Sequence, residues 1–230
     1  MKFKKIDITN HSLPLVRSLL ESLALKGLHC GSGANLKPGC LNSDSMQLSD
    51  ERGFTTKPGA LCFIDDSFFY LQHDATKPFP IENGVFQWIY SEHFIEHIPQ
   101  SLALSWFKDM RRLLKTDGLI RVSTPDLEKY IRGYLDPEEL FFKEHVKKLA
   151  DMGVTNVPTR RAWLVNQIFR NWGHQHIYDF DEIKFVASMA GFPVEKAQKC
   201  QFRSGIYPEV AELDREVRSD ESLYVELPLS

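Results

Sequence analysis

The sequence has few cysteines, little net charge and no long hydrophobic run, and each absence excludes a class of protein. Its four cysteines are irregularly spaced without a Cys-x-x-Cys pair, so neither a zinc ribbon nor a disulfide framework is predicted. We expect them to be free thiols in a reducing compartment. A formal net charge of -3 over 230 residues gives no electrostatic footprint for nucleic acid or for an anionic membrane.

Hydrophobic segments are short throughout the chain. No apolar run approaches the ~20 residues that a membrane span requires, and residues 1–11 are too polar for the hydrophobic region of a secretory signal. We therefore expect a cytoplasmic protein that acts on a small molecule, without a nucleic-acid or membrane partner. The sequence leaves the oligomeric state open.

Strand and helix patterns alternate along the chain, which favours an α/β fold with a doubly wound, mostly parallel sheet. Strands are expected at 25–30, 40–44, 68–72, 85–90, 119–123, 194–202 and 222–227, and helices at 12–24, 100–114 and 179–190. Residues 126–176 interrupt the alternation with a helical, aromatic-rich pattern. We predict a single domain over 1–230, with this segment as an insert that covers the carboxyl edge of the sheet.

A glycine loop follows the first of these sheet strands. Gly31 and Gly33 allow a sharp turn and the close approach of a ligand, although Gly-x-Gly alone fits many tight turns equally well. Gly33 and Leu41 are only eight positions apart, with Pro38-Gly39 between them. This leaves little room for the helix that binds pyrophosphate in dinucleotide-binding folds. The spacing favours an adenosine compound without phosphates.

Two aspartates follow expected strands and suit an adenosine ligand. Asp44 ends the strand at 40–44, where its two oxygens could accept hydrogen bonds from both ribose hydroxyls; the alternative is a solvated loop aspartate. Asp74 follows the strand at 68–72 and could accept a hydrogen bond from the exocyclic amine of adenine. Its alternative is a turn residue before Pro78.

In order and spacing, these motifs resemble the class I S-adenosylmethionine-dependent methyltransferases, in particular small bacterial methyltransferase-like proteins. The resemblance is carried by 28–44, 73–74, 90–99 and 113–118; it covers 25–125 well and the C-terminal strands more loosely. The opening Gly-x-Gly-x-Asn-x-x-Pro-Gly-x-x-Asn-x-Asp of that group is filled by Gly31, Gly33, Asn35, Pro38, Gly39, Asn42 and Asp44. The resemblance implies a seven-stranded Rossmann-like sheet with an antiparallel last strand, and S-adenosylmethionine as the cofactor.

The resemblance also implies which residues hold the cofactor. It places Gly31 and Gly33 near the methionine part, Asp44 on the ribose, Asp74 and Ala75 near adenine, and Ser91, Glu92 and His93 near the methionine and the transferable methyl group. Ser32 and His29, which stands where the family commonly has Asp or Asn, are further candidates for binding the cofactor. A neutral His29 could form a hydrogen bond at the methionine end, whereas a protonated His29 would repel the sulfonium.

Methyl transfer from a sulfonium mainly requires proximity and orientation, and a general base only where the acceptor must lose a proton. The candidate catalytic residues are His93, His97 and His176, because histidine suits proton transfer near neutral pH. His97 also fits a packing or capping role. His174 and His176 lack a third defined ligand, so no metal site is predicted.

The sequence therefore predicts S-adenosylmethionine-dependent methyl transfer to a small-molecule acceptor, which the insert and loops would select. Two alternatives remain open. One is a catalytically silent binding or scaffold protein, because His29, Ala34 and Gln87 depart from the residues usual in the family. The other is a non-methylating reaction of bound S-adenosylmethionine. The short glycine loop argues against a dinucleotide-dependent dehydrogenase.

Overall fold

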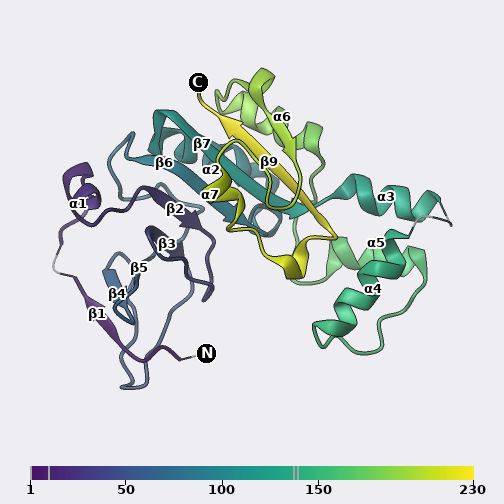
Figure 1. Cartoon of the computed structure of the whole chain (residues 1–230), viewed down its shortest axis with the longest axis horizontal. Helices are drawn as coiled ribbons and strands as arrows, with labels where there is room; N and C mark the ends of the chain where they lie inside the picture. The colour runs from purple at the N-terminus through teal and green to yellow at the C-terminus, as the bar shows by residue number, and fades with distance from the viewer. Residues whose placement is uncertain (1, 10, 137, 139) are drawn as a thin grey trace.

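The protein is an α/β structure built around one mixed sheet, seen in a computed structural model that describes residues 2–9, 11–136, 138 and 140–230. Its strands are β1 (Ile6–Ile8), β2 (Gly27–Cys30), β3 (Cys40–Asp44), β4 (Leu61–Ile64), β5 (Phe68–Gln72), β6 (Phe86–Glu92), β7 (Leu114–Pro125), β8 (Gln198–Cys200) and β9 (Ser222–Pro228). The spatial order is β1-β4-β5-β3-β2-β6-β7-β9-β8. The central strands β5, β3, β2, β6 and β7 are parallel, so their carboxyl ends share one edge (Figure 1).

The α/β class and the antiparallel last strand are confirmed, because β9 pairs antiparallel with β7. The predicted number of seven strands is wrong: within the described residues the sheet has nine. β1 and β4 extend it by antiparallel pairing beyond β5. With three and four residues, these two strands are too short to give a clear periodic signal.

Element boundaries follow the prediction where hydrophobic runs end at clear breaking residues. β3 and β5 have the predicted bounds, and α2 (Gln100–Leu113) ends one residue early. The helix expected at 12–24 is shorter, α1 (Arg17–Ser22). Leu15 is instead extended, because its N–H donates to the carbonyl of Pro80 at 2.9 Å. Residues 115–118 lie in a bulged part of β7, where its register with β6 shifts.

The two faces of the sheet differ in chemistry. One face carries alternate apolar strand residues that pack in the main core with α2 and α6 (Phe180–Met189). The opposite face carries His29, Tyr90 and Arg121, all buried. The segment 201–219, which includes α7 (Pro208–Ala211), covers it through hydrogen bonds to Arg121, Glu92 and other strand residues.

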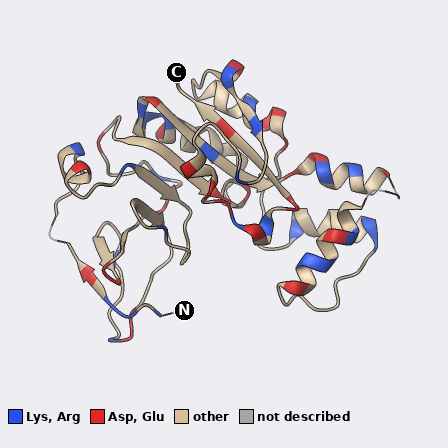
Figure 2. Cartoon of the chain, in the orientation of Figure 1, with Lys and Arg blue, Asp and Glu red and all other residues tan. Residues whose placement is uncertain are grey.

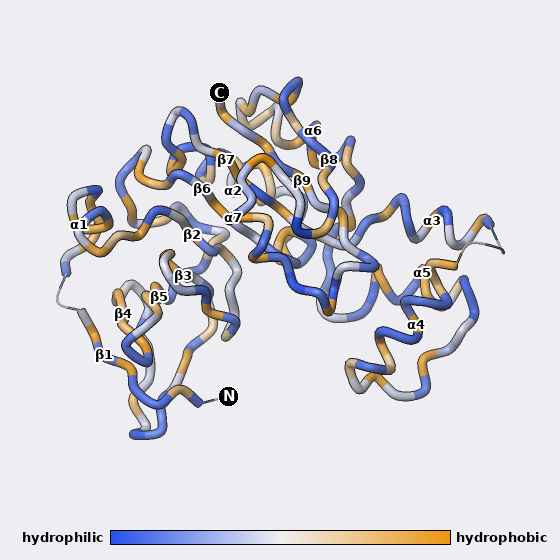
Figure 3. Tube along the Cα trace, viewed as in Figure 1, coloured by the Kyte–Doolittle hydropathy of each residue, from blue (hydrophilic) through white to orange (hydrophobic). Residues whose placement is uncertain are grey.

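The helical segment predicted at 126–176 contains α3 (Leu127–Leu135), α4 (Phe141–Asp151) and α5 (Arg161–Arg170). These helices lie together at one end of the molecule (Figure 1) and pack around Tyr130 in a cluster of their own. Hydrophobic and hydrophilic residues alternate along them (Figure 3). The chain leaves and rejoins the sheet at one point, because Leu127 N–H donates to the Tyr178 carbonyl at 3.0 Å. This point is the carboxyl end of β7.

Charges of both signs are interspersed over the helices and loops (Figure 2). Among the described helices, none combines the length and the apolar character that crossing a membrane would take.

Candidate functional site

A cavity of about 480 Å³ lies at the carboxyl edge of the parallel strands. It is lined by Gly31, Asp44, Ser45, Met46, Asp74, Ala75, Thr76, His93, Phe94, His97 and Ile98. These residues lie at or after the carboxyl ends of β2, β3, β5 and β6. β2 pairs with β3 on one side and with β6 on the other, so the cavity lies where the strand order reverses, the place where open α/β sheets bind ligands.

The glycine loop has the backbone geometry that its sequence predicts. Gly31 and Gly33 have φ of 75° and 52°, in the left-handed region that side chains disfavour. A Cβ atom at Gly31 would also lie 2.7 Å from the Cβ of Phe94. The loop therefore needs glycine at position 31 both for its turn and for its contact with the residues after β6.

Asp44 is half-buried at the end of β3 and holds the loop in place. Its Oδ2 accepts a hydrogen bond from Gly33 N–H, and its Oδ1 accepts one from Met46 N–H, both at 2.8 Å. Each carboxylate oxygen has a further lone pair. The carboxylate can therefore organise the loop and still accept hydrogen bonds from a diol in the cavity.

Asp74 follows β5 and is partly buried. Its Oδ1 accepts hydrogen bonds from the Thr76 hydroxyl at 2.6 Å and from Thr76 N–H at 3.1 Å, and Lys77 Nζ lies 3.3 Å from Oδ2. The Thr76 hydroxyl, more than the nearby Lys77, lowers the pKa of Asp74 below its usual value. Asp74 is thus an ionised acceptor beside Ala75 at the cavity wall.

The residues after β6 form a second polar group on the cavity. His93 has a left-handed backbone, φ 48°, a conformation that costs energy for a residue with a Cβ. Its Nε2 lies 2.7 Å from the Ser222 hydroxyl, which itself donates to the Arg218 carbonyl. Ser222 therefore accepts from His93, and this hydrogen bond fixes the orientation of the imidazole.

Glu96, in the short helix η1 (Ile95–His97), is fully buried behind His93. Its Oε2 accepts a hydrogen bond from the Thr124 hydroxyl at 3.1 Å. Burial opposes ionisation of Glu96, but the adjacent His93 imidazole outweighs it and lowers the pKa of Glu96 below its usual value. Burial likewise lowers the pKa of His97, so His97 is neutral near pH 7.

The structure brings part of the predicted site together. Gly31, Asp44, Asp74, Ala75, His93 and His97 line the cavity. Ser32, Gly33, Ser91, Glu92, His29 and His176 are not among the described residues that line it. Ser32 and Gly33 belong to the loop that Asp44 holds. Ser91 is buried within β6, and Glu92 accepts hydrogen bonds from Tyr90 and from Arg215 N–H.

His29 and His176 lie in other surroundings. His29 is buried on the polar face of the sheet, where its Nδ1 lies 3.1 Å from Asn42 Oδ1. Burial lowers the pKa of His29 to about 4, so it is neutral near pH 7. His176 lies in a separate surface pocket with Glu182, whose Oε1 is 3.6 Å from its Nε2.

The sequence did not predict a site role for Met46, Thr76, Phe94 or Glu96. Glu96 carries the clearest signal in retrospect, because it stands in the run His93-x-x-Glu96-His97 directly after a buried strand. The apolar residues Met46 and Phe94 give no such signal, since only the folded loops place them at the cavity.

Comparison with solved structures finds S-adenosylmethionine-dependent methyltransferases. An enzyme of this type from Mesorhizobium loti superposes with a TM-score of 0.50 at 16% identity, covering 92% of this chain and 96% of that chain. A second, from Thermotoga maritima, gives a TM-score of 0.48 at 14% identity over 89% of this chain and 82% of that chain. No family model and no curated protein matches the sequence. The likeness to the Mesorhizobium loti enzyme shows that the chain has the fold of these methyltransferases.

Proposed function

We propose that the protein is a single-domain S-adenosylmethionine-dependent methyltransferase that acts on a small-molecule acceptor. The observation that carries the proposal is the pair of aspartates at one cavity. Asp44 presents two carboxylate oxygens at the end of β3, and Asp74 presents an ionised carboxylate at the end of β5. With Gly31 between strand and cavity, they supply acceptors for a ribose diol and for an adenine amine. This set suits an adenosine group.

The reaction proposed is an in-line displacement. A lone pair of the acceptor attacks the methyl carbon, the carbon–sulfur bond breaks, and its electron pair stays on sulfur to give S-adenosylhomocysteine. The protein supplies proximity and orientation. Of the candidate catalytic residues, His93 and His97 line the cavity, and the side chain of His97 is the more accessible, 35% exposed against 5%. We propose that His97 faces the acceptor while His93 orients its neighbours.

Isothermal titration calorimetry with S-adenosylmethionine and S-adenosylhomocysteine tests the binding step. We expect both to bind, and we expect Asp44→Ala to weaken binding about 10- to 100-fold, because hydrogen bonds to a charged acceptor contribute roughly 1.5–3 kcal/mol each. The matched control is Asp66→Ala, whose exposed side chain pairs only with Lys5 among the described residues. Absence of binding, or equal binding by Asp44→Ala, contradicts the proposal.

Turnover separates methyl transfer from its alternatives. Formation of S-adenosylhomocysteine with a hydroxylated or aminated metabolite supports methyl transfer. Binding without S-adenosylhomocysteine formation across a broad metabolite screen indicates a silent binding protein. Consumption of S-adenosylmethionine without S-adenosylhomocysteine indicates a non-methylating reaction.

A further inference from the structure

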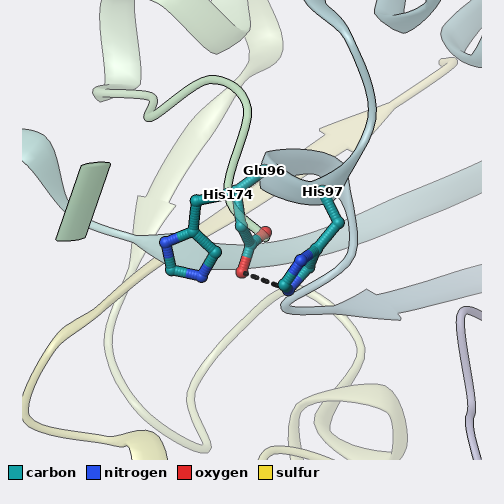
Figure 4. A group of neighbouring side chains, drawn as sticks. All are labelled: Glu96, His97 and His174. Carbon is teal, nitrogen blue, oxygen red and sulfur yellow. Dashed lines mark ion pairs between the residues drawn. The ribbon is translucent and has the colours of Figure 1, made fainter. Parts of the chain in front are cut away.

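Three potential metal ligands from two distant segments converge beside the cavity. Glu96 and His97 belong to η1, after β6, and His174 follows α5 (Figure 4). One ligand atom from each residue lies within 4.8 Å of the other two. His97 Nε2 is 3.9 Å from Glu96 Oε1, and the two imidazole rings are 4.9 Å apart between centroids.

Hydrogen bonds from Gln175 to two backbone carbonyls hold the two segments together at this point. Gln175 N–H donates to the Glu96 carbonyl at 2.7 Å, and the Gln175 side-chain amide donates to the His97 carbonyl at 2.7 Å. Gln175 follows His174 directly, so its two hydrogen bonds fix His174 beside Glu96 and His97. The fold itself therefore brings the three side chains together. Pre-positioned ligands are what a metal site requires.

The buried carboxylate of Glu96 has an unused oxygen. Oε2 is satisfied by Thr124, but Oε1 has no hydrogen-bond donor in the described part of the chain. His93 Nδ1 lies 3.1 Å from Oε1, yet not in hydrogen-bonding geometry. A buried carboxylate oxygen that accepts no hydrogen bond is costly, and direct coordination of a cation would reduce that cost beyond what the neighbouring His93 does.

The tautomer of His174 also favours a metal ligand. Its Nδ1 lies 2.6 Å from the Ile168 carbonyl, and a carbonyl oxygen can only accept. Nδ1 therefore carries the proton, and Nε2 has a free lone pair. A backbone carbonyl on the second ring nitrogen is the usual partner that orients a metal-binding histidine.

We propose that Glu96 Oε1, His97 Nε2 and His174 Nε2 bind a divalent transition-metal cation at the wall of the cavity. Two imidazole nitrogens and one carboxylate oxygen form the ligand set of catalytic zinc sites and of non-haem iron sites, which keep further positions open. Zinc–nitrogen bonds of about 2.0–2.1 Å are shorter than the present spacing allows, so the three side chains move closer together on binding.

His97 lines the cavity, so a metal ion bound at its Nε2 would lie beside the side chain that we propose faces the acceptor. The role of the metal there, which rests on the proposed function, is to bind an acceptor hydroxyl. Its oxygen–hydrogen bond breaks with the proton leaving to solvent, since a bound cation lowers the pKa of a coordinated oxygen. The oxygen then attacks the methyl carbon as the carbon–sulfur bond breaks. The inferred acceptor class is a hydroxyl compound that can coordinate a metal.

Metal titration of the purified protein tests this inference. After treatment with EDTA and its removal, the protein is titrated with ZnCl₂, MnCl₂ and CoCl₂ in the calorimeter, with no S-adenosylmethionine present. We expect one equivalent to bind, and the visible absorption of the cobalt form to report coordination. His174→Ala should weaken binding more than about 10-fold. His176→Ala, which removes a nearby histidine outside the cluster, should leave the metal affinity unchanged.

Equal metal affinity in wild type and His174→Ala, or no binding of any of the three ions, overturns the inference. Because Glu96 is buried, Glu96→Gln can fail to fold, and the partly exposed His174 supplies the decisive variant. Binding of S-adenosylhomocysteine is measured separately on the metal-free protein. If that binding persists while metal binding is absent, the metal site is rejected and the proposed function stands.

Discussion

His29 shows how the environment of one side chain decides what it contributes near the cavity. It stands two positions before Gly31, where a positive charge would act on a bound sulfonium. Lys37 N–H donates to Asn42 Oδ1, which makes that oxygen an acceptor, so His29 Nδ1 donates to it. Burial holds the pKa of His29 at about 4. His29 is therefore a neutral core residue at pH 7, and it places no positive charge near the glycine loop.

This burial predicts an acid-sensitive fold. His29 has a pKa of about 4 in the folded protein against 6.5 as the ordinary value, so between these pH values the unfolded chain binds more protons. Stability therefore falls as the pH drops from 6.5 towards 4, by roughly 3 kcal/mol from this residue. Urea unfolding across this range should show a shallower decline for His29→Leu than for wild type. Exposed His11 provides the control, and His11→Leu should follow wild type; parallel curves for His29→Leu and wild type would contradict the assignment.

At the scale of helices, the sequence predicts a boundary correctly where neighbouring residues alone determine it. Asp179 was predicted to begin a helix, and its Oδ1 accepts a hydrogen bond from Glu182 N–H at 2.8 Å at the start of α6. Such a cap depends only on neighbouring residues. α1 differs, because its start is set by the pairing of Leu15 with the distant strand segment at Ile81. Contacts of that kind have no local sequence signal.

The cap of α6 predicts a measurable loss of stability. Asp179→Ala removes the acceptor for Glu182 N–H and should lower the free energy of unfolding by about 1 kcal/mol. Asp181→Ala is the matched control: this acidic residue lies in the same first turn, with its side chain 90% exposed, and should cost only a few tenths of a kcal/mol through the helix dipole. Urea denaturation at pH 7 measures both. Equal losses would show that charge at the helix start, and not the cap, is what stabilises α6.

At the scale of the molecule, the glycine loop, Asp44 and Asp74 could be predicted because each follows a strand with a clear hydrophobic pattern. The cluster of Glu96, His97 and His174 could not, since its members come from segments joined only by tertiary hydrogen bonds. The segment that covers the polar face of the sheet could not be predicted either. Nothing local indicates that residues 201–219 fold over β7 and β9.

Arg121 is the centre of that cover. It is fully buried, and all five of its N–H donors are used: Nε and Nη2 donate to Asp214, Nη1 to Glu226, and the remaining two to the carbonyls of Ser204 and Gln201. Asp214 and Glu226 also accept backbone N–H groups of the same segment. One guanidinium thus joins β7, β9 and the covering segment.

Arg121→Met should therefore lower the free energy of unfolding by about 3–5 kcal/mol, because it leaves two buried carboxylates without their cation. The control is Arg132→Met, since Arg132 forms an exposed ion pair with Glu128 that contributes at most about 1 kcal/mol. Urea unfolding monitored by fluorescence measures both losses. Hydrogen exchange shows which part of the structure opens in Arg121→Met. We expect exchange to rise first in 201–219, with the parallel strands still protected. A loss for Arg121→Met no larger than that for Arg132→Met would mean that the covering segment is held by its apolar contacts alone.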